Sequence, residues 1–305
     1  MNAKLIEYLT ILKDNSDGYR SRAFELSIIT IRDLNYEISA DTISRLKGQI
    51  KAKQIKGIGT GIMARIEEFT LTGAIVEADV ISDETRSIDE LIKIKGVGKK
   101  TARIWYQRGI KSLVDIKRAV SRGDIEPTIA QKYGILYYYD LNEKIPRDEI
   151  TEYTNWMRNH IRSDTFDVVG SYRRGAQSSG DVDILISIKS VGAIKTMLAI
   201  QSAIMSEYFI CIIAEGELSL TYLYNFAGKV RQCDILITDK VGYPSALLYF
   251  TGSREHSIML RKRAKAMNYT LNQYGLFKGD KRLRAKSEKE IYEKLGLKFI
   301  EPNLR

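Results

Sequence analysis

The sequence predicts an α+β protein, with a helical N-terminal part and a C-terminal part built around a sheet. Two observations support this prediction. Between Met1 and Asp140, apolar residues recur at the three- and four-residue spacing of amphipathic helices. Further along the chain, three apolar runs have the length of strands, namely Tyr208–Ala214, Ser219–Phe226 and Val230–Ile237. A helix is expected before them, over Ile194–Met205.

At 305 residues the chain is long enough for a sizeable core and for more than one domain. Its formal net charge of +10, spread along the whole length, favours a polyanionic partner. Cys211 and Cys233 are too few for a disulfide framework and lack zinc-site companions. No apolar run has the length of a membrane span, and the first residues have the pattern of an amphipathic helix rather than a signal peptide. We therefore expect an intracellular, non-secreted protein without a membrane partner.

Four amphipathic helices are expected before Ile81, and the fourth ends at Thr72 with Gly73 as its C-cap. A five-residue pattern occurs twice, as Ile55–Gly59 and as Ile94–Gly98, each time ahead of a helix. Its glycines allow the positive φ of a tight hairpin, and amides at the following helix start bind phosphate without regard to sequence. The candidates for such contacts are Gly57, Gly59, Gly96, Gly98 and Lys99.

The stretch from Val168 to Ile186, VVGSYRRGAQSSGDVDILI, carries two closely spaced carboxylates. In a strand alternate side chains share a face, so Asp181 and Asp183 point the same way, while the apolar residues between and after them point into a core. Two carboxylates on one face repel each other unless a cation lies between them. Hard oxygen ligands of this kind suit Mg²⁺.

The loop just before the two aspartates offers backbone N–H groups, hydroxyls and a guanidinium, which are the groups that bind a polyphosphate. Its candidate ligand residues are Ser171, Arg174, Ser179 and Gly180. Loop and carboxylates together indicate a triphosphate held by a metal ion.

The pair Gly170-Ser171, followed by the Asp-x-Asp motif, resembles the signature of the nucleotidyltransferase superfamily. The longer string GSYRRGAQSSGDVD, taken with YFTGS at Tyr249–Ser253, is similar to the palm of family X DNA polymerases, the family of DNA polymerase beta. The similarity covers nearly the whole chain. It implies a helical, lyase-like N-terminal domain with helix-hairpin-helix motifs, followed by a hand-like polymerase domain with a nucleotidyltransferase palm sheet.

This resemblance implies templated addition of a deoxynucleotide to a primer 3′-OH, with release of pyrophosphate. Two Mg²⁺ ions, with Mn²⁺ as the alternative, would lie between the carboxylates; Asp181 and Asp183 bridge both ions and Asp234 completes the catalytic one. Asp234 is also the candidate general base. The resemblance assigns dNTP binding to Ser171, Arg174, Ser179, Gly180, Tyr249, Phe250, Gly252 and Ser257, and a template contact to Arg261.

The repeated glycine pattern resembles the helix-hairpin-helix, so its glycines and Lys99 are expected to bind DNA. In the family each hairpin also holds a monovalent cation, Na⁺ or K⁺, on backbone carbonyls. The corresponding residues are Lys53, Ile55 and Ile58 in the first hairpin, and Ile92, Ile94 and Val97 in the second.

In the family the N-terminal domain carries a lysine that forms a Schiff base with a deoxyribose phosphate. Aligned through GIGTGIMARIEEF, the position of this lysine is Arg65, and arginine does not release the proton that Schiff-base chemistry requires. Gly61, Glu77 and Phe24 also depart from the family pattern, while Arg20 keeps a cation. We therefore expect the lyase activity to be weak or absent and the domain to bind DNA.

Three further positions differ from the family, two of them near the nascent base pair and the third in a network that tightens when the enzyme closes. Arg254 replaces an acid, Ser257 replaces an asparagine, and Gln273 replaces a glutamate. These differences bear on the expected fidelity and closing of the enzyme, and they leave the three carboxylates intact.

The sequence therefore predicts a monomeric DNA-directed DNA polymerase that fills short gaps in base-excision repair, acting on dNTPs and on gapped or primer-template DNA. Four regions are expected: 1–81, lyase-like with the first hairpin; 82–141, DNA-binding with the second hairpin; 142–240, the catalytic palm; and 241–305, which binds the nascent base pair. Two alternatives are a template-independent terminal nucleotidyltransferase and a non-catalytic module that binds DNA gaps.

Overall fold

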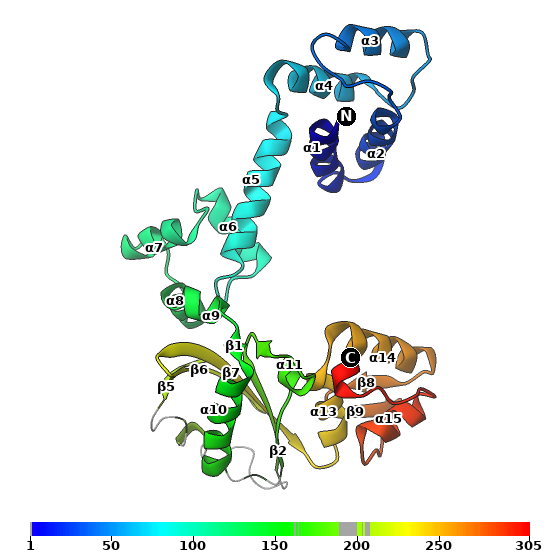
Figure 1. Ribbon diagram of the computed structural model, residues 1–305. Coiled ribbons are helices and arrows are strands. Elements are labelled where there is room, and N and C mark those ends of the chain that lie inside the picture. The colour runs from blue at the N-terminus through cyan, green and yellow to red at the C-terminus, as the bar shows by residue number, and fades with distance from the viewer. Residues whose placement is uncertain (1, 162, 164, 189–199, 203, 205–207) are drawn as a thin grey trace. The chain divides into compact units, whose positions relative to one another are not determined.

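The computed structural model describes residues 2–161, 163, 165–188, 200–202, 204 and 208–305 (Figure 1). The chain forms two compact units, Met1–Glu126 and Pro127–Arg305. Within the described ranges, no helix combines the length and the apolar composition needed to cross a bilayer. The helix expected over Ile194–Met205 lies largely outside the described residues.

The N-terminal unit is helical, as predicted. Apolar side chains from its first five helices meet in one core, where Leu5, Leu9 and Leu12 of the first helix are fully buried. Gly73 ends the fourth helix in the left-handed conformation, at the predicted C-cap. The fifth helix continues through residue 81, where the sequence suggests a domain boundary. The helices are α1 (Ala3–Asp14), α2 (Gly18–Arg32), α3 (Ile43–Lys51), α4 (Thr60–Thr72), α5 (Val76–Leu91), α6 (Lys99–Gln107) and α7 (Leu113–Ser121).

Both glycine repeats form turns that lead into a helix. Gly57 and Gly96 have φ values of 87° and 81°, a left-handed conformation that glycine adopts without steric cost. A side chain at Gly57 would also collide, because its Cβ would lie 2.9 Å from Thr30 Oγ1. Gly59 and Gly98 are the N-cap residues of α4 and α6. The first amides of both helices therefore have no partner within the helix.

The C-terminal unit contains a five-stranded sheet with strand order β2-β4-β7-β6-β5. β4 and β7 are parallel, and the other neighbours are antiparallel. The three runs predicted as strands correspond to β5, β6 and β7, which confirms those predictions. The strands are β2 (Thr165–Val168), β4 (Val182–Ile188), β5 (Phe209–Gly216), β6 (Ser219–Phe226) and β7 (Lys229–Asp239).

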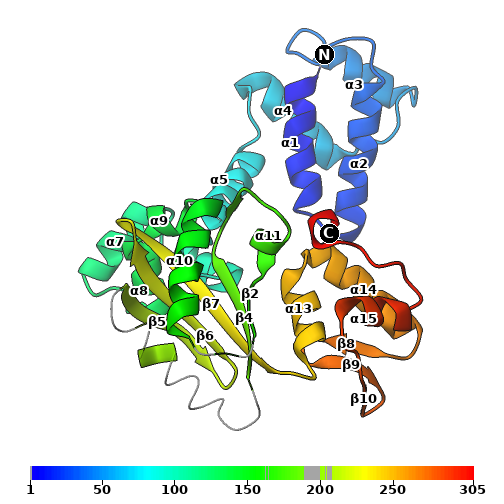
Figure 2. The ribbon, with the colours of Figure 1, turned by 60° about the horizontal axis from the view of Figure 1, so that its bottom comes forward.

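One long helix, α10 (Arg147–His160), packs against a face of this sheet (Figure 2). Its Tyr153 stacks on Tyr224 of β6 with ring centroids 3.8 Å apart. The same core takes up Val182 and Ile184 of β4, which are buried as the alternating pattern predicts. Their alternation leaves the intervening residues of β4 for the opposite face.

The last part of the unit has its own small core and a three-stranded sheet of order β10-β9-β8. Its elements are α13 (Tyr243–Thr251), α14 (Arg254–Ala266), β8 (Thr270–Asn272), β9 (Gly275–Lys278), β10 (Lys281–Leu283), α15 (Glu288–Lys294) and the 3₁₀ helix η1 (Pro302–Leu304). The remaining elements of the unit are α8 (Ile129–Leu136), α9 (Tyr138–Asn142), β1 (Ile145–Pro146), α11 (Gly170–Arg173) and β3 (Ser178–Ser179).

A two-residue turn, Ala227 and Gly228, joins β6 to β7. Both residues have positive φ, 51° and 79°, which is the pattern of a type I′ hairpin turn. The turn leaves β6 and β7 paired in an unbroken register that places Thr221 opposite Asp234.

Candidate active site

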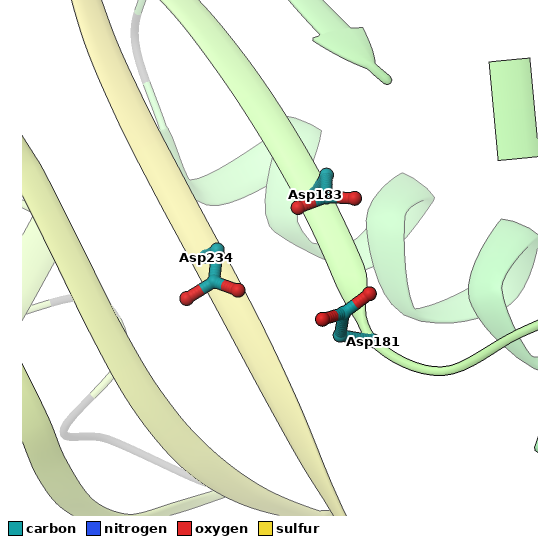
Figure 3. A group of neighbouring side chains, drawn as sticks. All are labelled: Asp181, Asp183 and Asp234. Atoms are coloured by element: carbon teal, nitrogen blue, oxygen red, sulfur yellow. The ribbon is translucent and has the colours of Figure 1, made fainter. Parts of the chain in front are cut away.

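Three carboxylates gather on one face of the large sheet (Figure 3). Asp183 lies in β4, Asp181 lies directly before β4, and Asp234 lies in the neighbouring strand β7. Asp183 and Asp234 are register partners in the parallel strand pair. One carboxylate oxygen from each residue lies within 4.8 Å of the others. The structure thus brings together the three residues singled out in the sequence, and hard oxygen donors at this spacing fit a divalent cation such as Mg²⁺.

The residues next to these carboxylates in sequence point the other way. Val182 and Cys233 have exposed fractions of 1% and 0%. Burial raises the pKa of the Cys233 thiol well above its ordinary value, so this thiol stays protonated in the core. The apolar side of β4 and β7 therefore fixes which residues face the site.

Gly170 allows the loop of residues 170–180, which is expected to bind phosphate, to approach the carboxylates closely. Its φ is +60°, and a Cβ at this position would lie 2.1 Å from Asp183 Oδ2. The amide of the preceding Val169 also donates to the carbonyl of Asp183 at 2.8 Å. Only glycine meets both the backbone conformation and the lack of space.

The serines proposed to bind phosphate lie together. Ser171, in α11, donates from its hydroxyl to Ser179 Oγ at 2.7 Å. A Cβ at Gly180 would lie 3.7 Å from Lys144 Nζ, so an ammonium group lies beside this glycine. Hydroxyls, backbone amides and a cation at one loop are a suitable set for anionic oxygens.

Arg174 connects this loop with the turn after α13. Its Nη1 donates to the carbonyl of Thr251 at 2.6 Å. The same nitrogen would lie 3.2 Å from a Cβ at Gly252. The structure therefore places the guanidinium against the turn that the family resemblance assigns to dNTP binding.

Arg147 hydrogen-bonds to the backbone of this loop. Its Nη1 donates to the carbonyls of Tyr172 at 2.7 Å and Ala176 at 3.1 Å. Its guanidinium carbon also lies 3.9 Å from the centroid of the Tyr172 ring. Beside it, Ile145 of β1 pairs with Ser179 of β3. β1 and the first residue of α10 thus contact the loop at Tyr172, Ala176 and Ser179.

The remaining residues proposed to contact the nucleotide or the template line two separate hollows. Tyr249, Ser257 and Arg261 line a small pocket. Phe250 instead lines a cavity of about 250 Å³ together with Leu236 of β7. The Tyr249 and Phe250 rings meet edge to face with centroids 5.0 Å apart.

In the N-terminal unit, the residues expected to hold monovalent cations lie in the segments that join α3 to α4 and α5 to α6. In the first hairpin, Lys53 has a positive φ of 57°. In the second, the Ile94 carbonyl accepts a hydrogen bond from the Val97 amide at 3.0 Å. Lys99 is the first residue of α6. The six candidates are Lys53, Ile55, Ile58, Ile92, Ile94 and Val97.

Arg65 lines a cavity of about 730 Å³ in the same unit. Its Nε donates to Glu77 Oε2 at 2.9 Å and its Nη1 to the carbonyl of Gly61 at 2.7 Å. Arg20, also in the cavity wall, pairs with Glu77 as well. Although burial raises the pKa of Glu77, the hydrogen bonds and charges of the two arginines outweigh it and lower that pKa. The position expected for a lyase amine is thus occupied by a guanidinium in an ion pair.

Sequence reasoning missed three residues that contact Asp234 or the loop of residues 170–180. Thr221 and Gln232 hydrogen-bond to Asp234, and Arg147 holds the loop. Gln232 stands two residues before Asp234, so strand alternation already predicts that the two share a face. Nothing in the sequence indicates Thr221, because its contact depends on how β6 pairs with β7.

Three family models match parts of the chain. They are the fingers domain of DNA polymerase lambda at residues 89–142, the DNA polymerase beta palm at 144–219 and the DNA polymerase beta thumb at 246–305. The palm match includes Asp181 and Asp183 and ends before Asp234.

The whole chain is also similar to curated polymerases. Its alignment with DNA polymerase lambda of Rattus norvegicus extends over 333 residues at 28% identity. The alignment covers 99% of this chain and 56% of that protein. Identity with DNA polymerase lambda of Arabidopsis thaliana is 27%, over 86% of this chain and 55% of the relative. Identity with DNA nucleotidylexotransferase of Xenopus laevis is 26%, over 93% and 63%. The chain thus spans little more than half the length of these relatives.

A solved structure of Leishmania infantum polymerase beta, in a ternary P/T complex, has a similar fold. Its TM-score is 0.66 at 27% identity, and the match covers 73% of this chain and 99% of that one.

Proposed function

Because the chain belongs to the family of DNA polymerases beta and lambda, we propose that it is a DNA-directed DNA polymerase that fills short gaps in DNA repair. One observation carries the proposal. The cluster of Asp181, Asp183 and Asp234 lies beside a loop whose Ser171 and Ser179 are already hydrogen-bonded to each other. Carboxylates for metal ions and donors for phosphate are thus combined at one site.

The three aspartates have different roles in metal binding and proton transfer. Asp181 and Asp183 would hold two Mg²⁺ ions, and Asp234 would complete the ligand set of one of them. When bound, the ions supply positive charge that makes the primer 3′-OH easier to deprotonate and stabilises the leaving pyrophosphate. Asp234 takes the proton of that hydroxyl as general base.

The loop residues bind the triphosphate. Ser171 and Ser179 donate from their hydroxyls to the β and γ phosphates, Arg174 contributes a guanidinium and Gly180 its amide. Tyr249, Phe250, Gly252 and Ser257 contact the sugar and base of the incoming nucleotide, and Arg261 contacts the template.

The hairpins bind the DNA backbone through Gly57, Gly59, Gly96, Gly98 and Lys99, with Na⁺ or K⁺ on the nearby carbonyls. Phosphate contacts of this kind give binding that falls steeply with salt and depends little on sequence. We assign residues 1–81 and 82–141 to DNA binding, 142–240 to catalysis and 241–305 to the nascent base pair, in a protein that acts as a monomer on dNTPs and gapped DNA.

Nucleotide addition on three substrates tests the proposal. These are a single-nucleotide gap with a 5′-phosphate, an open primer-template and an unpaired single strand, each with Mg²⁺ and one dNTP at a time. We expect template-matched addition that is fastest on the gap and is lost in Asp234→Ala. Gap binding without addition on any substrate would reduce the protein to a binding module.

A second candidate function is template-independent terminal transfer. The similarity to the DNA nucleotidylexotransferase of Xenopus laevis favours it. Addition to the single strand, regardless of which dNTP is supplied, would establish this activity in place of gap filling.

We further propose that deoxyribose-phosphate lyase activity is weak or absent. Arg65 supports this, because its guanidinium stays protonated and is paired with Glu77. Borohydride trapping on an incised abasic site should give little cross-linked protein. Efficient cross-linking that persists in Arg65→Ala would mean that another amine performs the reaction.

A further inference from the structure

Asp234 lies in the middle of a row of side chains that crosses three strands. In the antiparallel pair β6–β7 it lies opposite Thr221, and in the parallel pair β4–β7 it lies opposite Asp183. Figure 3 shows the Asp234 side chain on its own strand beside the strand that carries Asp183. One flank of the carboxylate therefore faces the other two aspartates, and the other flank faces β6.

Both oxygens of Asp234 accept a hydrogen bond from a neutral donor. Thr221 Oγ1 donates to Oδ1 at 2.5 Å, and Gln232 Nε2 donates to Oδ2 at 2.8 Å. Gln232 is only 5% exposed, so its amide has few other orientations. A carboxylate oxygen accepts about two hydrogen bonds, which leaves capacity on each oxygen for a metal ion or a proton.

These two contacts orient the carboxylate without neutralising it. Among the ion pairs of the described residues, none includes Asp234. The neighbouring Arg231 instead pairs with Glu149, at 2.8 Å, and is itself 2% exposed. A cation at the place of Gln232 would compete with a metal ion for the charge of Asp234. A neutral amide does not.

The torsion that these contacts control is soft. Rotation of an aspartate about its last side-chain bond has a broad, roughly two-fold profile, so the strand alone does not fix where the two oxygens point. Groups that hydrogen-bond to metal ligands set this orientation in many metal sites.

We propose that Thr221 and Gln232 are positioning residues, which hold the Asp234 carboxylate as an uncompensated anion turned toward Asp181 and Asp183. This inference rests on the proposed polymerase function for its kinetic consequences, because it deepens the role of Asp234 there. Its consequence for metal binding stands on the carboxylate cluster alone.

The test replaces Gln232 with methionine, which keeps the length of the side chain and removes the donor. In single-nucleotide gap filling we expect kcat to fall about 10- to 100-fold, the usual effect of losing a group that orients a metal ligand. The KM for the dNTP should stay within about twofold, because Gln232 has no role in holding the triphosphate. Thr221→Val should act in the same direction, and Thr221→Ser, which keeps the hydroxyl, should restore the wild-type rate.

Gln201 offers a matched control, because its Nε2 also donates to a carboxylate, that of Glu215, at 3.0 Å in an exposed position. Gln201→Met should leave kcat and KM unchanged. Thermal unfolding of all four variants shows whether a lower kcat reflects lost positioning or lost structure. Thr221→Ser and Gln201→Met show how much a substitution at position 221 and a change from glutamine to methionine alter stability when the hydrogen bonds to Asp234 are kept.

A second readout needs no turnover. Titration of the full chain with Mn²⁺, followed by the electron paramagnetic resonance signal of the free ion, should show weaker binding in Gln232→Met than in the wild type and in Gln201→Met. Unchanged Mn²⁺ affinity in a folded Gln232→Met protein with wild-type kcat overturns the inference. An increase in KM alone also overturns it, since that places Gln232 in nucleotide binding. If the wild type adds no nucleotide while Mn²⁺ affinity still depends on Gln232, the proposed function fails and the inference stands.

Discussion

Arg173 donates two hydrogen bonds to Glu288, at 3.1 Å and 2.7 Å, although 115 residues separate them in the chain. Arg305 donates to the same carboxylate at 2.6 Å, and its side chain is fully buried. Arg173 also donates to the hydroxyl of Thr251 at 2.6 Å. These contacts join the loop of residues 170–180 to α15 and to the end of α13.

Replacing Glu288 with alanine leaves two guanidinium groups without their carboxylate. Removal of one side of a buried ion pair costs about 3–5 kcal/mol. We expect a loss near the lower end, because the Arg173 side chain is 23% exposed and keeps its bond to Thr251. Chemical denaturation of the full chain measures the effect. Glu293→Ala, an exposed change on the same helix, should stay within about 0.5 kcal/mol of the wild type; equal midpoints for both variants would contradict a stabilising role for the ion pairs.

Gly170→Ala should abolish nucleotide addition. The added methyl would lie 2.1 Å from Asp183 Oδ2, and the positive φ is unfavourable for alanine. The collision must displace either the loop or the carboxylate. Gap filling and gap binding should be measured together, since the hairpins of the N-terminal unit are untouched and binding should persist. Gly48→Ala serves as control, because a Cβ there meets nothing within 4 Å; full activity of Gly170→Ala would show that the close approach is unnecessary.

Arg147→Lys should weaken dNTP binding without affecting DNA binding. Lysine has no planar group that stacks on Tyr172 while one of its nitrogens donates to both carbonyls. We expect the dNTP affinity to be about tenfold weaker, which corresponds to a loss of about 1.4 kcal/mol of binding free energy. Single-turnover gap filling at varied dNTP concentration gives this constant. Arg158→Lys is the matched control, because Arg158 lies on the same helix with its guanidinium 5.0 Å from the Phe166 ring; equal dNTP affinities in both variants would mean that the loop holds its shape unaided.

His256 should make stability fall as the solution is acidified. Burial lowers the pKa of His256 below its ordinary value of 6.5, and the charge of Arg305 lowers it further. The folded state therefore binds this proton less readily than the unfolded chain. Its contribution to stability is complete above pH 6.5 and decreases as the pH falls through that value.

Thermal unfolding at about pH 7.5 and about pH 5.5, on either side of the ordinary histidine pKa, measures this dependence. The decrease in midpoint should be smaller in His256→Gln than in the wild type. His160→Gln, at the exposed second histidine, should keep the wild-type dependence. The same decrease in all three proteins would assign the effect to other groups.

The architecture of the site follows largely from sequence periodicity. Alternation in β4 predicts that Asp181 and Asp183 share a face, and the family resemblance supplies Asp234. The strands β6 and β7 are apparent as apolar runs because each is buried on at least one side, and β5 has an apolar run although its side chains are only half-buried or exposed. These features are local in sequence, so a local pattern reveals them.

The features that escaped prediction join distant segments. The pairing of Arg173 with Glu288, the contact of Thr221 with Asp234 and the pairing of Arg65 with Glu77 depend on tertiary structure. A charged residue in the sequence does not reveal its partner, and strand register is invisible until the turn between the strands is known.

The register of β7 on β6 depends on the length of the turn at Ala227 and Gly228, and the composition of the turn does not suggest this dependence. Moving β7 by one position along β6 would place the Cys233 thiol where the Asp234 carboxylate now lies. An inserted residue must therefore be absorbed as a bulge, or the cluster loses the Asp234 carboxylate in a single step. Substitutions in the turn can accumulate gradually, whereas changes in its length cannot.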